Sequence, residues 1–384
     1  MDFNLPEDLV LLQQTVRKFA DDEVAPHAAD RDRAHEFPLA LIRSAANLGL
    51  MGASVPEEWG GSSLGNLGGS LITEEVSRVD ASLGVALSVH NSLVATPILR
   101  FGADDLKRKY LPKLASGEWL GAYALTEAQA GSDAANQATK AEKRGDTYVL
   151  NGVKMWITNG AYADVFIVFA RTSMDDPTKK HKGITAFVVE KTMPGIRPGK
   201  TEHKLGIRAS STTELVLDQC VVPASNVLGE VGKGFSVAMD TLDGGRIGIA
   251  SQAIGIAQGC LDASLKYAKQ RKQFNRPLAD FQAIQWKLAE MATGIESARL
   301  LVRRAAWLRD RGEPCSVAAS MAKMQASVMA NRCAEEAVQI HGGAGYTTDF
   351  PVERFMRDAR ITEIYEGTTE IQHLVIAKHV LSAT

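Results

Sequence analysis

The chain lacks a surplus of charge of either sign and lacks long apolar runs. Among its 384 residues, 43 are Lys or Arg and 45 are Asp or Glu, which leaves a formal net charge of -2 at pH 7. A strong positive balance, which would indicate a nucleic-acid partner, is therefore missing. No uninterrupted apolar run approaches the roughly 20 residues that a membrane-spanning helix needs. We expect neither a nucleic-acid partner nor a membrane span.

Cysteine and histidine are scarce and scattered. The four cysteines stand far apart, and none of the eight histidines forms a His-Glu-x-x-His pair. The sequence therefore predicts no metal site and no disulfide framework. Isolated thiols favour a reducing compartment, and the acidic, turn-like residues 1–6 are unlike a secretory signal. We expect a cytoplasmic protein.

Hydrophobic periodicity divides the chain into three parts, and two of them are helical. Residues 1–118 follow helical spacing, and so do residues 230–384. Within the second part, apolar residues recur in alternating steps of four and three over 284–308, which is typical of a bundle helix. Further helices are predicted near 241–273, 315–341 and after 369, and they complete a C-terminal four-helix bundle.

The middle part, residues 119–229, has a different pattern. Its apolar runs are short and rich in Val, Ile, Phe, Tyr and Thr. The turn pairs Gly145-Asp146, Asn151-Gly152 and Asn159-Gly160 separate these runs. Such close spacing without intervening helices predicts an antiparallel β-barrel or sandwich, and of these we expect the barrel. The fold class is thus mainly α with an inserted β domain.

Near the C-terminus, a glutamate precedes a predicted helix. Thr369 and Gln372 form a capping-box pattern, and Glu366 lies between Tyr365 and Gly367. In isolation, such a glutamate is best interpreted as a surface residue in a capping loop. The helix N-terminus should lower the pKa of Glu366, whereas burial by a ligand should raise it.

The motif is not isolated. Met-Arg-Asp-Ala-Arg at 356–360, followed by Ile-Tyr-Glu-Gly-Thr at 364–368, resembles the C-terminal signature of the acyl-CoA dehydrogenases. The resemblance covers essentially the whole chain, including the order of helical, β and four-helix-bundle domains. It implies that Glu366 is the catalytic base and that Tyr365 and Gly367 lie beside the substrate.

Two segments of the middle part carry the resemblance further. The stretch 123–133 contains Thr-Glu-x-x-x-Gly-Ser-Asp, although Ala128-Gln129 stand where family members commonly have Pro and Gly. The second segment is Met-Trp-Ile-Thr-Asn-Gly at 155–160. The residues alone indicate only a turn in the first segment and a core tryptophan in the second. The resemblance implies a flavin lining, and it gives Ser132 an additional contact with the CoA arm. The implied flavin-binding residues here are Tyr123, Leu125, Thr126, Ser132, Trp156, Ile157 and Thr158.

The resemblance also assigns residues of the C-terminal part. Asp243 and Arg246 have the spacing of a simple ion pair, and the resemblance places them beside the CoA portion of the substrate. The glycines at 343–345 follow a helix rather than a strand, which argues against a dinucleotide-binding fold. The resemblance instead implies further FAD contacts, some of them from a neighbouring subunit, by Arg271, Gln273, Phe274, Phe281, Gln282, Gln339, Gly342, Gly343, Thr368 and Glu370.

The implied activity is FAD-dependent dehydrogenation of an acyl-CoA to the trans-2-enoyl-CoA. Electrons would pass to an electron-transfer flavoprotein, and the shared FAD site implies a homotetramer. The segments 360–365 and 245–250 look most like those of members specific for short straight or branched acyl chains. Three alternatives remain: an acyl-CoA oxidase, a non-catalytic flavin-binding member of the family, and a helix-bundle protein without cofactor.

Overall fold

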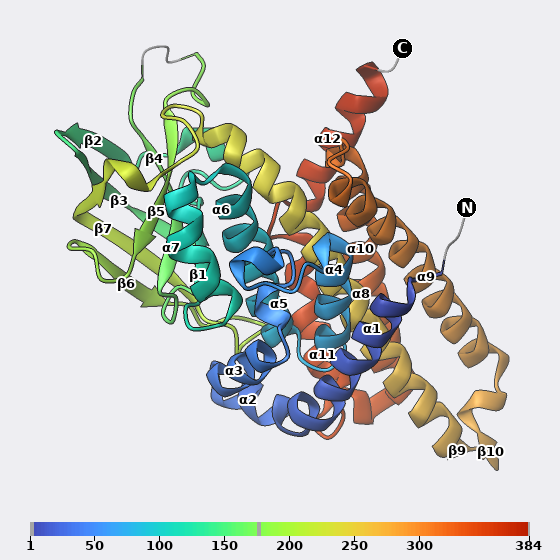
Figure 1. Ribbon diagram of the computed structural model, residues 1–384. Helices are drawn as coiled ribbons and strands as arrows, with labels where there is room; N and C mark the ends of the chain where they lie inside the picture. The colour runs from blue at the N-terminus through green and yellow to red at the C-terminus, as the bar shows by residue number, and fades with distance from the viewer. Residues whose placement is uncertain (1–3, 175–177, 383–384) are drawn as a thin grey trace.

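The computed structural model describes residues 4–174 and 178–382, and residues 1–3 of the turn-like start lie outside these ranges. Its N-terminal helices pack against both the sheet and the long helix α8 (Figure 1). This arrangement places the N-terminal part between the other two. The N-terminal helices are α1 (Glu7–Phe19), α2 (Ala28–Ala34), α3 (Leu39–Asn47), α4 (Gly65–Ser77), α5 (Ala81–Ser88), α6 (Thr96–Phe101) and α7 (Asp104–Ala115).

One N-terminal helical run is long and apolar enough to satisfy the length and composition test for a membrane span. It covers Ala81–Phe101, and 89% of its apolar 18-residue window is buried inside the protein. The side chain of Asp80 caps its start by accepting hydrogen bonds from the backbone N–H groups of Ser82 and Leu83. Its middle turns, η5 (Val89–Ala95), are π-helical. Because its side chains pack in the protein interior, the run is a core helix.

The β-rich part does not form the predicted antiparallel barrel. Its strands pair in the order β6-β7-β3-β2-β4-β5-β8, so β6 and β8 are ends of an open sheet in the described chain. β1 and β2 each pair with β4 in parallel, which makes the sheet mixed. The strands are β1 (Gly121–Ala124), β2 (Lys140–Arg144), β3 (Thr147–Thr158), β4 (Val165–Arg171), β5 (Ile184–Glu190), β6 (Ile196–Thr201), β7 (Thr212–Pro223) and β8 (Val227–Leu228).

One predicted turn of this sheet is a bulge. Gly145-Asp146 forms the hairpin turn between β2 and β3, and Asn159-Gly160 follows the end of β3, as predicted. Asn151-Gly152 instead lies inside β3, where the register with β7 shifts. The Asn151 side chain accepts a hydrogen bond from the backbone N–H of Gln219 at 2.8 Å. A bulge uses the same residue types as a turn, so local sequence did not distinguish them.

Three long helices form the C-terminal part: α8 (Gly234–Gln270), α9 (Gln282–Asp310) and α10 (Ser316–His341). The apolar stripe of α9 is confirmed, because Met291, Ile295, Ala298, Val302 and Ala305 are all buried. The shorter α11 (Val352–Arg360) packs on α8 and α10.

The last helix departs from the predicted bundle. α12 (Thr369–Ser382) contacts α10 and then extends away from the body of the protein (Figure 1). Its only fully buried side chain is Gln372, whereas Leu374 is 64% and Val380 56% exposed. Helical periodicity located this helix, but its apolar face lacks a partner surface within the described chain.

Ion pairs join the N-terminal helices to the bundle. The Glu74 carboxylate on α4 lies 2.8 Å from the Arg299 guanidinium on α9, and both side chains are largely buried. Asp310, at the end of α9, accepts hydrogen bonds from the backbone N–H groups of Asn66 and Leu67 at the start of α4. The two parts are therefore joined at two points along α4.

Arg299→Leu should destabilise the protein by about 3 kcal/mol, because it leaves the buried Glu74 carboxylate without its partner. Burial already raises the pKa of Glu74, and Arg299 opposes that rise. Adding Glu74→Leu should recover most of the loss, measured as the urea midpoint. Arg33→Leu, which removes an exposed pair, should change the midpoint little. A double variant no more stable than the single one would contradict this account.

Candidate active site

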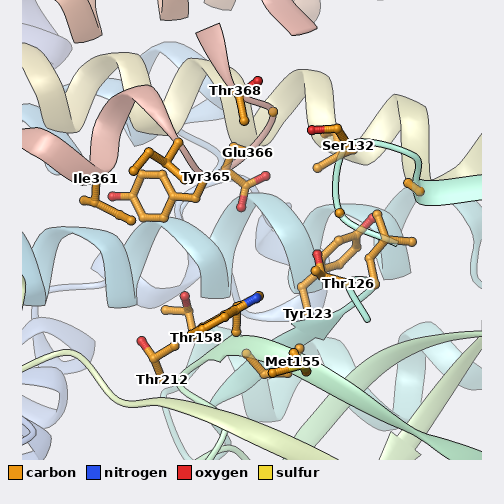
Figure 2. A pocket seen from close by; sticks show the side chains of 18 of the residues that line it. Tyr123, Thr126, Ser132, Met155, Thr158, Thr212, Ile361, Tyr365, Glu366 and Thr368 are labelled. Atoms are coloured by element: carbon orange, nitrogen blue, oxygen red, sulfur yellow. The ribbon is translucent and has the colours of Figure 1, made fainter. Parts of the chain in front are cut away.

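A cavity of about 800 Å³ opens where the three parts of the chain meet. Its wall includes residues of η5, β1, β3, the loop 202–207, α8 and the segment 361–368. Figure 2 shows Tyr365, Glu366 and Thr368 on one side and Met155, Thr158 and Thr212 on the opposite side. A ligand in this cavity would contact residues from the N-terminal helices, the sheet and the bundle at once.

Most residues expected near the reacting groups line this cavity. The wall contains residues predicted for flavin, for substrate and for catalysis, and Thr368 of the FAD set also belongs to it. The predicted residues found there are Tyr123, Leu125, Thr126, Ser132, Trp156, Ile157, Thr158, Arg246, Tyr365, Glu366, Gly367 and Thr368.

The Glu366 carboxyl lies in the cavity without a polar partner of its own. Its Oε2 atom is buried and has no hydrogen-bond partner among the described residues. Burial raises the pKa of this carboxyl to about 7, and the positive charges of Lys323 and Arg246 oppose the rise. The sequence led us to expect basicity to come mainly from ligand binding, but the protein itself already desolvates the carboxyl. A carboxyl titrating near neutral pH is suited to act as a base.

The backbone places Glu366 in a conformation that few side chains adopt. Its φ is 54°, and that of Gly367 is 91°. A non-glycine residue in the left-handed region costs free energy, and such residues concentrate at functional sites. Thr368 follows these two residues, and its hydroxyl accepts a hydrogen bond from the backbone N–H of Ile371 at the start of α12.

The capping box proposed for α12 is wrong by one residue. Thr368, rather than Thr369, caps the helix. Gln372 does not reach back to a cap N–H. Its side-chain amide instead donates to the carbonyl oxygens of Gly367 at 2.9 Å and Glu366 at 3.4 Å.

Gly245 of α8 makes room for the Glu366 carboxyl. A Cβ atom added at Gly245 would lie 2.6 Å from Glu366 Oε2 and 2.9 Å from Cδ2 of Leu93. Contacts this short would force one of the two neighbours to move. The close approach that this glycine permits is therefore made by Glu366.

The opposite wall combines an aromatic surface with hydroxyl groups. Trp156 lies in a bulge of β3 with a φ of 63°, and its side chain is 56% exposed. Tyr123 Oη is buried and has no hydrogen-bond partner among the described residues. The Thr126 and Thr158 side chains line the same cavity. This set of donors and apolar faces fits a flat ring that carries heteroatoms, such as a flavin.

A buried ion pair supports the loop that carries Thr126. Lys154 Nζ donates to Glu127 Oε1 at 2.8 Å, to Gln137 Oε1 at 2.9 Å and to the Leu125 carbonyl at 3.1 Å. Burial lowers the pKa of Lys154 to about 8. Burial alone would raise the pKa of Glu127, but Lys154 and neighbouring N–H groups lower it. Gln129, which departs from the family pattern, also donates to Glu127.

Asp243 and Arg246 form the ion pair that their spacing predicts. Arg246 Nη1 lies 2.8 Å from Asp243 Oδ1, and the Ser316 hydroxyl donates to the other oxygen of Asp243. Only Arg246 lines the cavity. Asp243 therefore orients Arg246 from behind the cavity wall.

The remaining predicted FAD residues lie away from this cavity within the single chain. They occupy the hairpin after α8, the start of α9 and the end of α10, and Glu370 is exposed on α12. None of them belongs to the cavity wall in the described chain. These residues are Arg271, Gln273, Phe274, Phe281, Gln282, Gln339, Gly342, Gly343 and Glu370.

Several wall residues were not predicted from the sequence. Val89 and Leu93 of η5 contribute apolar surface, and Leu93 approaches the region of Glu366. Arg357 and Arg360 of α11 also line the cavity. A helical apolar stripe indicated burial of η5, but it could not show that the buried face borders a cavity.

Comparison with known proteins assigns almost the whole chain to one family. Three family models match: the N-terminal domain of acyl-CoA dehydrogenase over residues 6–118, its middle domain over 122–220 and its C-terminal domain over 232–381.

Individual relatives are similar over their full length. The short-chain specific acyl-CoA dehydrogenase of Clostridium acetobutylicum is 51% identical, over 98% of this chain and 99% of the relative. Butyryl-CoA dehydrogenase of Megasphaera elsdenii is 47% identical, with a TM-score of 0.96 over 99% of this chain and 100% of that chain. A chain solved in work on the electron transferring flavoprotein of Acidaminococcus fermentans is 49% identical, with a TM-score of 0.97 over the same shares. This chain therefore belongs to the acyl-CoA dehydrogenase family.

Proposed function

We propose that this protein catalyses the FAD-dependent α,β-dehydrogenation of a short-chain acyl-CoA to the trans-2-enoyl-CoA. The observation that carries the proposal is the Glu366 carboxyl. Its Oε2 atom is buried and has no hydrogen-bond partner among the described residues, and Glu366 lines a cavity that Tyr123, Thr126 and Thr158 also line. A base that must remove a weakly acidic proton needs this combination of desolvation and a free oxygen.

The residues of the chain divide the chemistry between two walls. Glu366 accepts the proton from the α-carbon of the acyl group. Trp156, Thr126 and Thr158 would hold FAD, which would supply a hydride acceptor for the β-carbon. Leu93 and Val89 exclude water from the apolar part of the cavity, which strengthens electrostatic interactions there. Arg246, oriented by Asp243, binds polar groups of the CoA portion.

We further propose that electrons leave to an electron-transfer flavoprotein and that the protein works in the cytoplasm. The solved chain from the work on an electron transferring flavoprotein, 49% identical to this one, supports the first point. The four cysteines support the second, because each is free and buried within the described chain.

Glu366→Gln should keep FAD and acyl-CoA binding but lower the rate of flavin reduction by roughly 10²–10⁴-fold, because the amide cannot accept the α-proton. Anaerobic flavin bleaching and exchange of the α-proton with solvent measure this directly. Glu290→Gln, on the exposed face of α9, provides the control. Substantial bleaching in the Glu366 variant would exclude it as the base, and Glu127, Asp243 and Glu370 would then need testing.

The same assay separates the three alternatives. Rapid anaerobic bleaching followed by slow reoxidation in air indicates a dehydrogenase, whereas fast reoxidation by oxygen indicates an oxidase. A yellow protein that no acyl-CoA bleaches indicates a non-catalytic flavin-binding member. A colourless purified protein indicates a structural helix-bundle protein.

Short acyl chains should be preferred. The short-chain specific relative that is 51% identical supports this proposal. Butyryl-CoA or a short branched acyl-CoA should exceed a C12 substrate in kcat/KM by roughly tenfold or more. Initial rates across a C4 to C12 series test the order. A preference for C12 would contradict the short-chain proposal and leave the dehydrogenation chemistry intact.

A homotetramer with shared FAD sites is the proposed assembly. Apolar side chains outside the cavity support it: Phe274 is 87%, Trp286 65% and Leu374 64% exposed in the single chain. Burial of these side chains between subunits would remove apolar surface from water. They lie on the segments that also carry the FAD residues placed far from the cavity.

Arg271→Ala should weaken both flavin retention and tetramer stability, because the proposal places this arginine at the cofactor between subunits. Sedimentation and the flavin absorbance of the same fractions measure both quantities. Arg144→Ala, on the exposed strand β2, should change neither. A monomer saturated with flavin would contradict the shared site.

A further inference from the structure

Lys323 is a charged side chain in the interior of the bundle. It lies on α10, and none of its surface is exposed. Lysine is almost never fully buried unless it is paired. Its Nζ donates a hydrogen bond to the backbone carbonyl of Gly367 at 2.8 Å. An ammonium group thus holds the residue that follows the base.

A second donor holds the same carbonyl. The side-chain amide of Gln372 lies 2.9 Å from the Gly367 carbonyl oxygen, and Gln372 is also fully buried. Lys323 and Gln372 approach from different helices, α10 and α12. Two donors from two helices restrict this peptide group more than either one would alone.

The restriction matters because the Glu366 carboxyl provides no anchor. Its Oε2 atom has no partner in the part of the chain that is described, and its backbone is left-handed at a φ of 54°. Such a conformation persists only when its surroundings enforce it. The base is therefore positioned through its backbone, while its Oε2 atom stays without a hydrogen-bond partner.

Lys323 is also one of the charges nearest to the base. Charged groups interacting with Glu366 or Lys323 come from several elements: Arg246 from α8, Glu363 from the turn after α11, and Glu370 from α12. The titratable hydroxyls of Tyr123 and Tyr365 also interact with Glu366, and Asp358 interacts with Tyr365. Burial lowers the pKa of Lys323 to about 8. The ammonium is thus retained at neutral pH, where its charge favours the carboxylate form of Glu366.

We propose that Lys323 is a positioning residue for the dehydrogenation. It fixes the Glu366–Gly367 backbone through the Gly367 carbonyl, and its positive charge favours the ionised form of the Glu366 carboxyl. The inference rests on the proposed role of Glu366 as base and adds the group that holds and tunes it. Gln372 provides a second, uncharged hydrogen-bond donor to the same Gly367 carbonyl.

Two variants separate the mechanical part from the electrostatic part. Lys323→Met removes both the hydrogen bond and the charge, whereas Gln372→Met removes a hydrogen bond and leaves the charge. Both should lower kcat more than they change KM. Activity requires the Glu366 carboxylate and is lost as pH falls through its pKa. Removing the positive charge raises that pKa, so only Lys323→Met should move the acidic limb of kcat to higher pH, by about one unit.

A readout independent of turnover uses infrared difference spectra. The carboxyl stretch assigned to Glu366 is the band missing in Glu366→Gln, and its titration midpoint should rise in Lys323→Met. Lys323→Arg should restore most of the wild-type midpoint. Arg332→Met removes a positive charge from an exposed site on the same helix. It should leave the titration midpoint of Glu366 unchanged.

The outcomes distinguish this inference from the proposed function. A Lys323→Met protein with the wild-type midpoint and pH profile would overturn the role of Lys323 and leave Glu366 as base. If Lys323→Met shifts the infrared midpoint but Glu366→Gln still bleaches the flavin, the electrostatic effect of Lys323 on Glu366 is retained. The proposed role of Glu366 as base is then refuted. If Lys323→Met does not fold, Lys323→Gln, which keeps a hydrogen-bond donor and removes the charge, provides the test, and a wild-type midpoint in that variant would overturn the role of the charge. Equal shifts in Gln372→Met and Lys323→Met would also overturn the role of the charge.

Discussion

The need for a carboxyl that is buried and yet free determines much of this structure. An oxygen that is to accept a proton cannot be tied up by hydrogen bonds, so Glu366 must be held by other means. The left-handed backbone at Glu366, the glycine that follows it and the space above Gly245 all serve this need. Each feature has a local cost in conformational free energy, which the packing of α10 and α12 around the turn offsets.

No single part of the chain forms the cavity. The N-terminal run contributes the apolar side chains of η5, the sheet contributes hydroxyl and aromatic groups, and the bundle contributes the base. Their relative placement depends on ion pairs and helix caps across the domain borders, such as Glu74 with Arg299 and Asp310 at the start of α4. Stability and site geometry are therefore linked, because loosening these borders would also separate the two walls of the cavity.

Two buried lysines have similar roles, and each supports a segment that lines one side of the cavity. Lys154 holds the loop that carries Thr126, and Lys323 holds the turn that carries Glu366. Both bind backbone carbonyls and both lie near a carboxylate. Burying an ammonium is costly unless its hydrogen bonds are satisfied. In both places the hydrogen bonds of the lysine hold a backbone segment in a defined position next to the cavity.

The sequence by itself determined the order of helical, β and helical parts and the stripe of α9, and the family motifs that it contains pointed to Glu366 and to part of the cavity wall. Those features depend on periodicity and on short motifs, which are local properties. It did not determine the open, mixed sheet, because parallel pairing of β1 with β4 joins segments that no turn connects. It also placed the cap of α12 one residue late and gave no sign of Lys323, whose position in a helical pattern looks like any lysine. Tertiary structure decided these points, because burial, the partner of a strand and the distance between Nζ and a carbonyl oxygen depend on segments far apart in the chain.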